Sequence, residues 1–240
     1  MKTLLSTTYC GPVQWYQKLY RSEEVLMERQ ETFQKQTYRN RCVIATTNGL
    51  QTLTVPVERS SSNLIKDIRI SNHGNWRHQH WFALMSAYNE SPFFDYYQDD
   101  FRPFYERQYD FLYDFNMEIC HKVCELIDIQ PNIKETSFYR SAGVRPLPPP
   151  SPCRGSLTSN PSSLISNLSS KIGSSPHSTN LSTRQLVNSS TEIIDFRSAI
   201  NPKHPADDAD FVPRRYYQVY ERKHGFQPNL SILDLLFNMG

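Results

Sequence analysis

The chain has 240 residues, of which 38% are hydrophobic and 12% aromatic, enough for a core in one large domain or two small ones. Its 26 basic and 24 acidic residues give a net charge of +2, which excludes a global field that recruits nucleic acid or an anionic membrane. No stretch approaches the roughly 18 apolar residues of a membrane-spanning helix, and the start lacks the apolar core of a signal peptide. We therefore expect a cytoplasmic protein with no membrane insertion.

The first residues predict a strand, a helix and a second strand. Thr3 to Tyr9 fit a short strand, and Pro12 suits the first turn of a helix. The apolar residues that follow at helical spacing are Val13, Trp15, Tyr16, Leu19 and Tyr20. Glu24 to Phe33 predict the next strand.

A hairpin is the clearest local signal. Asn48-Gly49 lies between two runs of alternating apolar residues, and this pair accepts the positive φ angles of a type I′ turn. The stretch LIKDIRIS, residues 64–71, also alternates and predicts another strand. Together these elements predict an antiparallel or mixed sheet.

Helices dominate the part of the chain after Gly74. One helix is expected up to the stretch NESP, Ser91-Pro92 opens a short aromatic helix, and a longer helix is expected from about Pro103 to Ile129. Because strands come first and helices after, the order favours an α+β fold over an alternating parallel sheet.

Residues 141–190 differ from the rest in composition. They are rich in Ser, Pro and Asn and contain too few apolar residues to offset the entropy of ordering, so we expect a disordered insert. Residues 1–140 and 191–240 then form a single α+β domain. Its end predicts two short helices, with Gly225 as the stop of the first and Ser231 as the N-cap of the second.

Five cysteines, an odd number, favour reduced thiols over a disulfide framework. Cys120 and Cys124 form a possible metal pair with His121, but at helical spacing they share a face with apolar residues. Since a zinc site needs further ligands and no second cluster is visible, a core position is favoured over a metal site. The sequence identifies no cofactor.

Several stretches together resemble the WbqC-like family, in the form found in Bacteroidetes-type bacteria. They are TTYCGPVQWYQKL, KQTYRNRCVI, LTVPVE, IRISNHGNWRHQHW, AYNESPFFDYY, PRRYYQVYERKHGF and NLSILDLLFN. The chain has Ser6-Thr7 where the family often has Gln-Pro, Gln14 where a Gly would fall, and Asn40-Arg41-Cys42 for an Asn-Arg-Asn triplet. The family is named from surface-polysaccharide gene clusters, so the resemblance implies work on sugar nucleotides or modified sugars, with acyl or aminoacyl transfer as one possibility.

Four polar residues before the predicted hairpin form the first candidate site: Lys35, Arg39, Asn40 and Arg41. Arg39 and Arg41 would point to the same face of a strand, where two guanidiniums can clamp a phosphate or carboxylate. The alternative is a salt-bridged sheet edge with Glu28 and Glu31 opposite. With the resemblance taken into account, the anion clamp and the salt-bridged edge are equally well supported.

The stretch SNHGNWRHQHW, residues 71–81, is the second candidate. One of His73, His78 or His80 would serve as a general base, although capping and solvating a helix start is the favoured alternative. His78 and His80 are two residues apart and so cannot bind one metal from a helix. Trp76 and Arg77 beside them would stack on a base or a sugar ring.

Cys42 is a candidate nucleophile because neighbouring guanidiniums lower the pKa of a thiol, but its strand position makes a core role more probable. Cys10 invites the same interpretation more weakly. No phosphate-binding glycine loop, Ser-His-Asp signature or paired-carboxylate motif is present.

The leading hypothesis is a group-transfer enzyme that acts on an amino sugar or a nucleotide-linked sugar. Its site would combine the opening helix, with Gln14 and Tyr16, with residues 35–42 and 73–80. The alternative is a non-catalytic module that binds a nucleotide-sugar or an anionic glycan. Single-stranded nucleic acid is a poorer fit because the chain lacks the necessary net positive charge.

Overall fold

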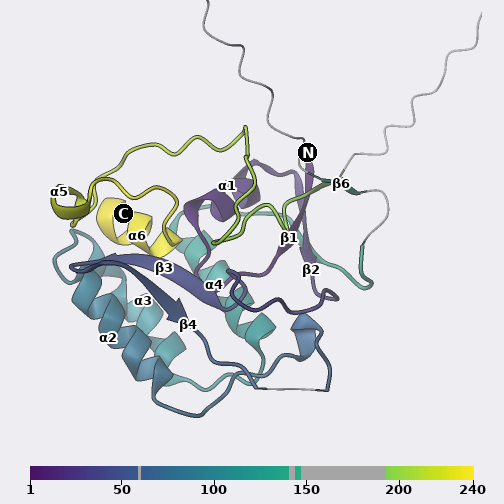
Figure 1. Cartoon of the computed structure of the whole chain (residues 1–240), viewed down its shortest axis with the longest axis horizontal. Coiled ribbons are helices and arrows are strands. Elements are labelled where there is room, and N and C mark those ends of the chain that lie inside the picture. Colours follow the sequence, from purple (N-terminus) through teal and green to yellow (C-terminus); the bar gives the residue numbers. More distant parts are fainter. Residues whose placement is uncertain (59–60, 141–143, 147–192) are drawn as a thin grey trace, which may run out of the picture. The chain divides into compact units, whose positions relative to one another are not determined.

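The structure is a computed structural model that describes residues 1–58, 61–140, 144–146 and 193–240 (Figure 1). Apart from residues 144–146, the predicted disordered insert lies outside the described residues, so its disorder stays a prediction. The remaining parts of the chain contain both helices and strands, as the sequence predicts.

The main sheet has five strands in the order β5-β2-β1-β7-β6, and every neighbouring pair is parallel. The strands are β1 (Lys2–Ser6), β2 (Glu24–Glu28), β5 (Ile133–Glu135), β6 (Val144–Pro146) and β7 (Ile193–Asp195). β1 lies in the middle, and its Leu4 pairs with Leu26 of β2 and with Asp195 of β7. β1 and β2 are buried along most of their length, as expected for a parallel sheet.

A separate two-stranded sheet forms the predicted hairpin, β3 (Arg41–Thr46) and β4 (Gly49–Thr54). The hairpin is confirmed, but its turn is one residue earlier than predicted. Thr46 pairs with Gly49, so Thr47 and Asn48 form the turn, and Gly49 takes the positive φ of 109° as the first strand residue.

The helices of the described residues are α1 (Val13–Arg21), α2 (Trp76–Tyr88), α3 (Phe94–Glu106), α4 (Leu112–Leu126), α5 (Glu221–His224) and α6 (Ile232–Met239), with one 3-10 turn, η1 (Ile65–Asp67) (Figure 1). The two C-terminal signals are confirmed: Gly225 follows α5 with a φ of 72°, and the Ser231 side chain caps α6 by accepting from the Leu233 backbone N–H. None of these helices has the length and apolarity needed to cross a membrane.

Three sequence predictions need correction. The antiparallel or mixed arrangement holds only for the hairpin, because the main sheet is parallel and takes β5, β6 and β7 from the second half of the chain. Residues 64–71 contain η1 and isolated bridges instead of a strand. The helix break falls after Glu106 instead of before Pro103, because buried Phe104 and Tyr105 keep α3 helical beyond the proline.

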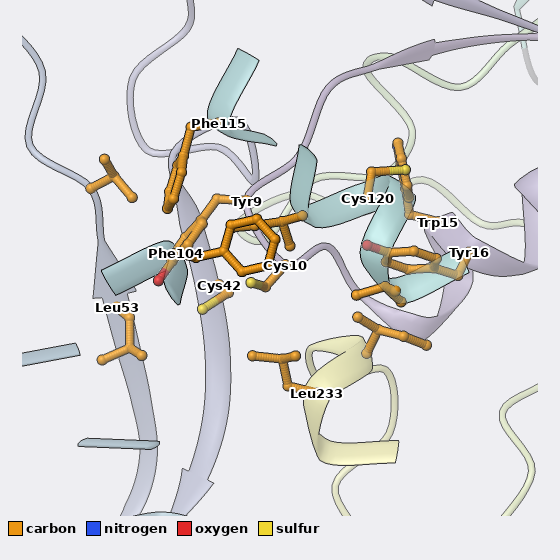
Figure 2. Close-up of a cluster of buried hydrophobic side chains, with 14 of the residues drawn as sticks. Tyr9, Cys10, Trp15, Tyr16, Cys42, Leu53, Phe104, Phe115, Cys120 and Leu233 are labelled. Carbon is orange, nitrogen blue, oxygen red and sulfur yellow. The ribbon is translucent and has the colours of Figure 1, made fainter. Parts of the chain in front are cut away.

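One hydrophobic cluster joins the main sheet, the hairpin and the long helices. Figure 2 shows Tyr9 and Trp15 from the N-terminal segment packed with Phe104 of α3, Phe115 of α4 and Leu233 of α6. Full burial of each such large apolar side chain contributes about 1.5–3 kcal/mol. The cluster therefore fixes the loop after β1, which lies at the candidate site.

Candidate functional site

The carboxyl edge of the main sheet is the first place to look for a site. β1 continues through α1 to β2 on one side, while β7 pairs with β1 on the other side and comes from a distant part of the chain. In open parallel sheets, ligands bind at the carboxyl ends of strands where the connections diverge in this way. We call the polar residues at this place, Ser6, Thr7, Glu28, Glu31, Arg39, Asp195 and Arg197, the edge site.

Arg39 is held at the edge site by a buried ion pair. Its Nε donates to Glu31 Oε1 at 2.7 Å, and its Nη2 donates to Glu31 Oε2 at 2.6 Å. The Ser6 hydroxyl at the end of β1 joins them, because it donates to Glu31 Oε2 and accepts from Arg39 Nη2 at 2.7 Å. Both charged side chains are about 5% exposed, so the guanidinium is fixed in orientation.

Arg197, just after β7, anchors a second, partly buried ion pair. It donates to both oxygens of Asp195 and, at 3.3 Å, to Glu28 Oε2 at the end of β2. Glu28 is fully buried and also accepts from Thr136 Oγ1 at 2.5 Å and from the Gln30 backbone N–H at 2.9 Å. Two arginines are therefore brought to one edge from opposite halves of the chain.

A small hollow lies between them. It is lined by Ser6, Thr7, Thr8, Trp15, Tyr38, Arg39, Phe196, Arg197 and Ile200, and its volume of about 10 Å³ suits one water molecule or one ligand oxygen. Within the described residues, the buried Thr7 Oγ1 and Thr8 Oγ1 have no hydrogen-bond partner, and Arg39 Nη1 makes no hydrogen bond. These groups can donate to an oxygen placed in the hollow, such as that of an anion or a hydroxyl group.

The other residues of the first predicted site are arranged differently from the expected clamp. Arg41 begins β3, and its Nε is buried without a partner. Asn40 is buried and donates to the Val55 carbonyl at 2.9 Å, while Lys35 is exposed. Of the hypothesised pair, only Arg39 lines the hollow, and Arg197 lies there with it.

Gln14 and Tyr16 of α1 both lie in buried surroundings. Gln14 donates to Asp208 Oδ2 at 2.9 Å and accepts from Asn229, so it joins α1 to the C-terminal part of the chain. Tyr16 packs edge-on against Trp15, and its hydroxyl has no partner among the described residues. Neither side chain lines the hollow.

The second predicted site lies on a different surface, which we call the α2–α3 groove. This groove has a volume of about 500 Å³ and is lined by Arg77, His78, Trp81, Phe82, Met85, Arg102 and Tyr105, with Gly74, Asn75, Glu106 and Gln108. His78 lies against Phe82 with ring centroids 4.2 Å apart, and Arg77 stacks on Trp76 at 4.7 Å. The groove therefore combines aromatic rings, two guanidiniums and an imidazole.

The three candidate histidines are in separate environments. His73 and His78 are exposed, whereas His80 is buried and lies 2.9 Å through Nδ1 from the Tyr9 hydroxyl. That hydroxyl is also 2.9 Å from the hydroxyl of Tyr105. Burial lowers the pKa of His80 to about 4, so this imidazole is neutral at pH 7. Only His78 lines a ligand-sized concavity.

Cys42 lies in the hydrophobic core beside Cys10, as Figure 2 shows. Burial, followed by the hydrogen bond that the thiol makes to Cys10, raises the pKa of the Cys42 thiol well above its usual value. A nucleophile needs the opposite direction, so the geometry favours the core interpretation. Cys120 and Cys124 are likewise buried, and within the described ranges no three His, Cys, Asp or Glu side chains lie close enough to hold a metal ion.

Sequence reasoning missed Arg197, Asp195 and the role of Glu28 in the edge site. The only signal was their position: Glu28 and Asp195 end strands of the same parallel sheet, and Arg197 follows two residues later. Because the sheet was expected to be antiparallel or mixed, these strand ends were not expected to meet.

Comparisons with known proteins identify a family but no activity. A protein of Mycobacterium tuberculosis (strain ATCC 25618 / H37Rv), named Uncharacterized protein Rv1507c, is 26% identical over 221 residues, which cover 91% of this chain and 84% of that protein. No solved structure matches the chain. The model of the WbqC-like protein family matches residues 7–240. Since this match spans nearly the whole chain, the protein belongs to the WbqC-like protein family.

Proposed function

We propose that this protein binds an anionic or nucleotide-linked sugar at the edge site and transfers an acyl or aminoacyl group to it, as a step in surface-polysaccharide synthesis. The observation that carries the proposal is the meeting of Arg39 and Arg197 at one hollow on the carboxyl edge of the parallel sheet. Two fixed guanidiniums and the free Thr7 hydroxyl suit the oxygens of a phosphate, carboxylate or sugar hydroxyl.

Family membership supports the sugar as the ligand class, because the family takes its name from surface-polysaccharide gene clusters. The small volume of the hollow limits the part of the ligand that enters it to one oxygen-bearing group, with the rest of the sugar outside. A transferred acyl group also needs a base to take the proton from the accepting amine or hydroxyl. The edge site contains two carboxylates, Glu28 and Glu31, but each is held by an arginine and neither lines the hollow, so no residue is assigned to this role.

A second candidate, a non-catalytic binding module, is favoured by one specific observation. No histidine or cysteine lines the edge-site hollow. His80 and Cys42 are buried in the core, and His78 lies in the α2–α3 groove. Binding of the same sugar without any transfer is therefore the main rival to the enzyme.

The test is a thermal-shift screen of the full chain against nucleotide-sugars, anionic sugars and acyl donors. A ligand at 100 times its dissociation constant stabilises the folded state by about 2.7 kcal/mol. Arg39→Lys and Arg197→Lys keep the charge but lose the planar two-donor fork, so each is expected to weaken binding by tenfold to a hundredfold. Arg41→Lys is the matched control and is expected to bind like the wild type, because Arg41 does not line the hollow.

Mass spectrometry of the sugar after incubation with acyl donors separates the two candidates. An acylated sugar supports the transferase, and binding without any product supports the module. If the Arg39→Lys and Arg197→Lys variants are folded and bind the sugar as well as the wild type, the edge site is not the ligand site and the proposal is wrong.

A further inference from the structure

A further concave surface lies beside α1, and its lining includes none of the candidate site residues that the sequence predicts. It runs between α1 and residues 209–216, and Phe226, Asn229 and Leu235 complete it. Its volume is about 630 Å³, within the range of ligand pockets. We call it the arginine groove, because Arg21, Arg214 and Arg215 all line it.

The groove is formed by fixed elements. Gln17 Nε2 and Arg21 Nη1 of α1 donate to the Asp210 carbonyl at 3.0 and 3.1 Å. Two residues earlier, Asp208 forms a buried ion pair with Lys18 at 2.6 Å and accepts from Gln14. One face of α1 therefore holds the turn at residues 208–210 in place, and a ligand would enter a groove that is already shaped.

The charges in the groove favour an anion. Among the described residues, the carboxylates at the three arginines are Asp210, which lines the groove, and Glu221, which contacts Arg215. Arg214 is exposed and makes no ion pair or hydrogen bond to any described residue. Its guanidinium at the rim can therefore offer a planar fork of donors to a phosphate.

The walls of the groove favour a ligand with a flat, largely apolar body. Phe211, Tyr216 and Phe226 contribute rings, and the last two meet edge to face at 5.4 Å. Gln17 Oε1 is buried and accepts no hydrogen bond from the described residues, while the Gln17 amide nitrogen donates to the Asp210 carbonyl. A ligand that offers an N–H beside an aromatic surface would satisfy this acceptor.

We propose that the arginine groove binds a nucleoside diphosphate, with the diphosphate on Arg214 and its neighbours and the base inside near Gln17. A nucleobase supplies the flat ring and the N–H donor, and the diphosphate supplies the anion. A simple phosphate would leave the apolar walls and Gln17 unused, and an alkyl phosphate would leave Gln17 without a donor. The assignment stands on this groove alone and does not require that the edge site bind a sugar.

The experiment is isothermal titration of the full chain with uridine, guanosine and adenosine diphosphates, with inorganic pyrophosphate and dodecyl phosphate as comparison ligands. We expect at least one nucleoside diphosphate to bind tenfold or more tightly than pyrophosphate. Arg214→Gln is expected to weaken nucleotide binding about tenfold, the loss of one charge-assisted contact. Arg222→Gln in α5 is the matched control, because Arg222 is exposed and does not line the groove.

Each contrary result overturns the assignment. Failure of all three nucleotides to bind at millimolar concentration removes the site. If the Arg214→Gln variant binds nucleotide as tightly as the wild type, the nucleotide does not bind in the arginine groove. If dodecyl phosphate or pyrophosphate binds as tightly as the nucleoside diphosphates, the base is not recognised. The Arg39→Lys variant keeps the two proposals apart, since it should bind sugar weakly but nucleotide normally. Loss of nucleotide binding in Arg39→Lys alone would place the nucleotide at the edge site instead.

Discussion

The edge site and the α2–α3 groove both contain arginines, but they hold them in opposite ways. Arg39 is 4% exposed and shares its donors between Glu31 and Ser6, whereas Arg102 in the groove is 59% exposed and pairs with Glu106 one helical turn away. The first guanidinium has one orientation and little room beside it. The second has ample room but is free to leave its partner, because exposed pairs are weak and screened by water.

This difference shows that the ligand-sized concavity and the preorganised charges lie in different parts of this molecule. The α2–α3 groove, with a volume of about 500 Å³, is lined by exposed side chains such as Phe82 and Arg102, while the most strongly held charges surround a hollow of about 10 Å³. A fixed ionic network is expected where the side chains that contact a ligand must keep one geometry. An open groove is sufficient where an aromatic or sugar ring of the ligand only has to lie against the protein surface. Stability measurements can test whether the two regions really differ in this way.

The largest effect is expected for Arg39→Ala. This change leaves Glu31 buried without its cation, and breaking one partner of a buried pair costs about 3–5 kcal/mol. Chemical denaturation measures the loss as a change in the free energy of unfolding. Arg102→Ala serves as the control from the groove and should cost less than about 1 kcal/mol.

The pair is also tested by removing both partners. The double variant Arg39→Met with Glu31→Leu leaves no uncompensated charge and is expected to recover part of the loss. A cost for Arg39→Ala below about 1 kcal/mol would mean that the edge-site pair behaves like a surface pair, and the contrast with the groove would disappear.

The next effect is a dependence of the free energy of unfolding on pH that arises from His80. Burial lowers the pKa of His80 from 6.5 to about 4, so the unfolded chain binds this proton more readily than the folded one. Stability that is present above pH 6.5 is therefore lost as the pH falls towards 4. At about 1.4 kcal/mol for each pKa unit, the total loss is about 3 kcal/mol.

The measurement is the free energy of unfolding between pH 7 and 4 for the wild type and His80→Gln. Titrating carboxylates affect both proteins alike, so the difference isolates His80. The His80→Gln variant should lose less stability on acidification than the wild type. Parallel curves for the wild type and His80→Gln would show that the buried imidazole takes a proton without cost.

Local elements of the fold were predictable, but the pairing of the main sheet was not. Asn48-Gly49, Gly225 and Ser231 each carry a short-range signal, and the hairpin, the helix stop and the cap all form. β7 has only three residues, Ile193–Asp195, and joins β1 across nearly the whole chain length. A segment so short has no periodicity of its own, and local patterns do not encode its partner.

The site was predictable only in part, for the same reason. The sequence suggested both an anion clamp and an ion pair with Glu31 for Arg39, and the ion pair is present in a buried form. The second arginine at the hollow, Arg197, comes from the strand whose pairing could not be foreseen. The different directions of His78 and His80 were expected, since two residues on a helix turn the side chain by about 200°, but which of the two is buried was not predicted.

The smallest effect is expected for the aromatic wall of the α2–α3 groove. Phe82 is 53% exposed, and its ring lies against that of His78, which is also exposed. Phe82→Ala should therefore change the free energy of unfolding by less than about 1 kcal/mol. Phe101 of α3 is fully buried, and Phe101→Ala should cost about 3–5 kcal/mol by opening a cavity. Denaturation of the two variants under one condition makes the comparison direct.

If Phe82→Ala destabilises as much as Phe101→Ala, the groove is part of the core and its side chains are no freer than those of the edge site. A small loss in Phe82→Ala leaves a ring that is exposed without a structural need, which is what a surface for a sugar or base requires.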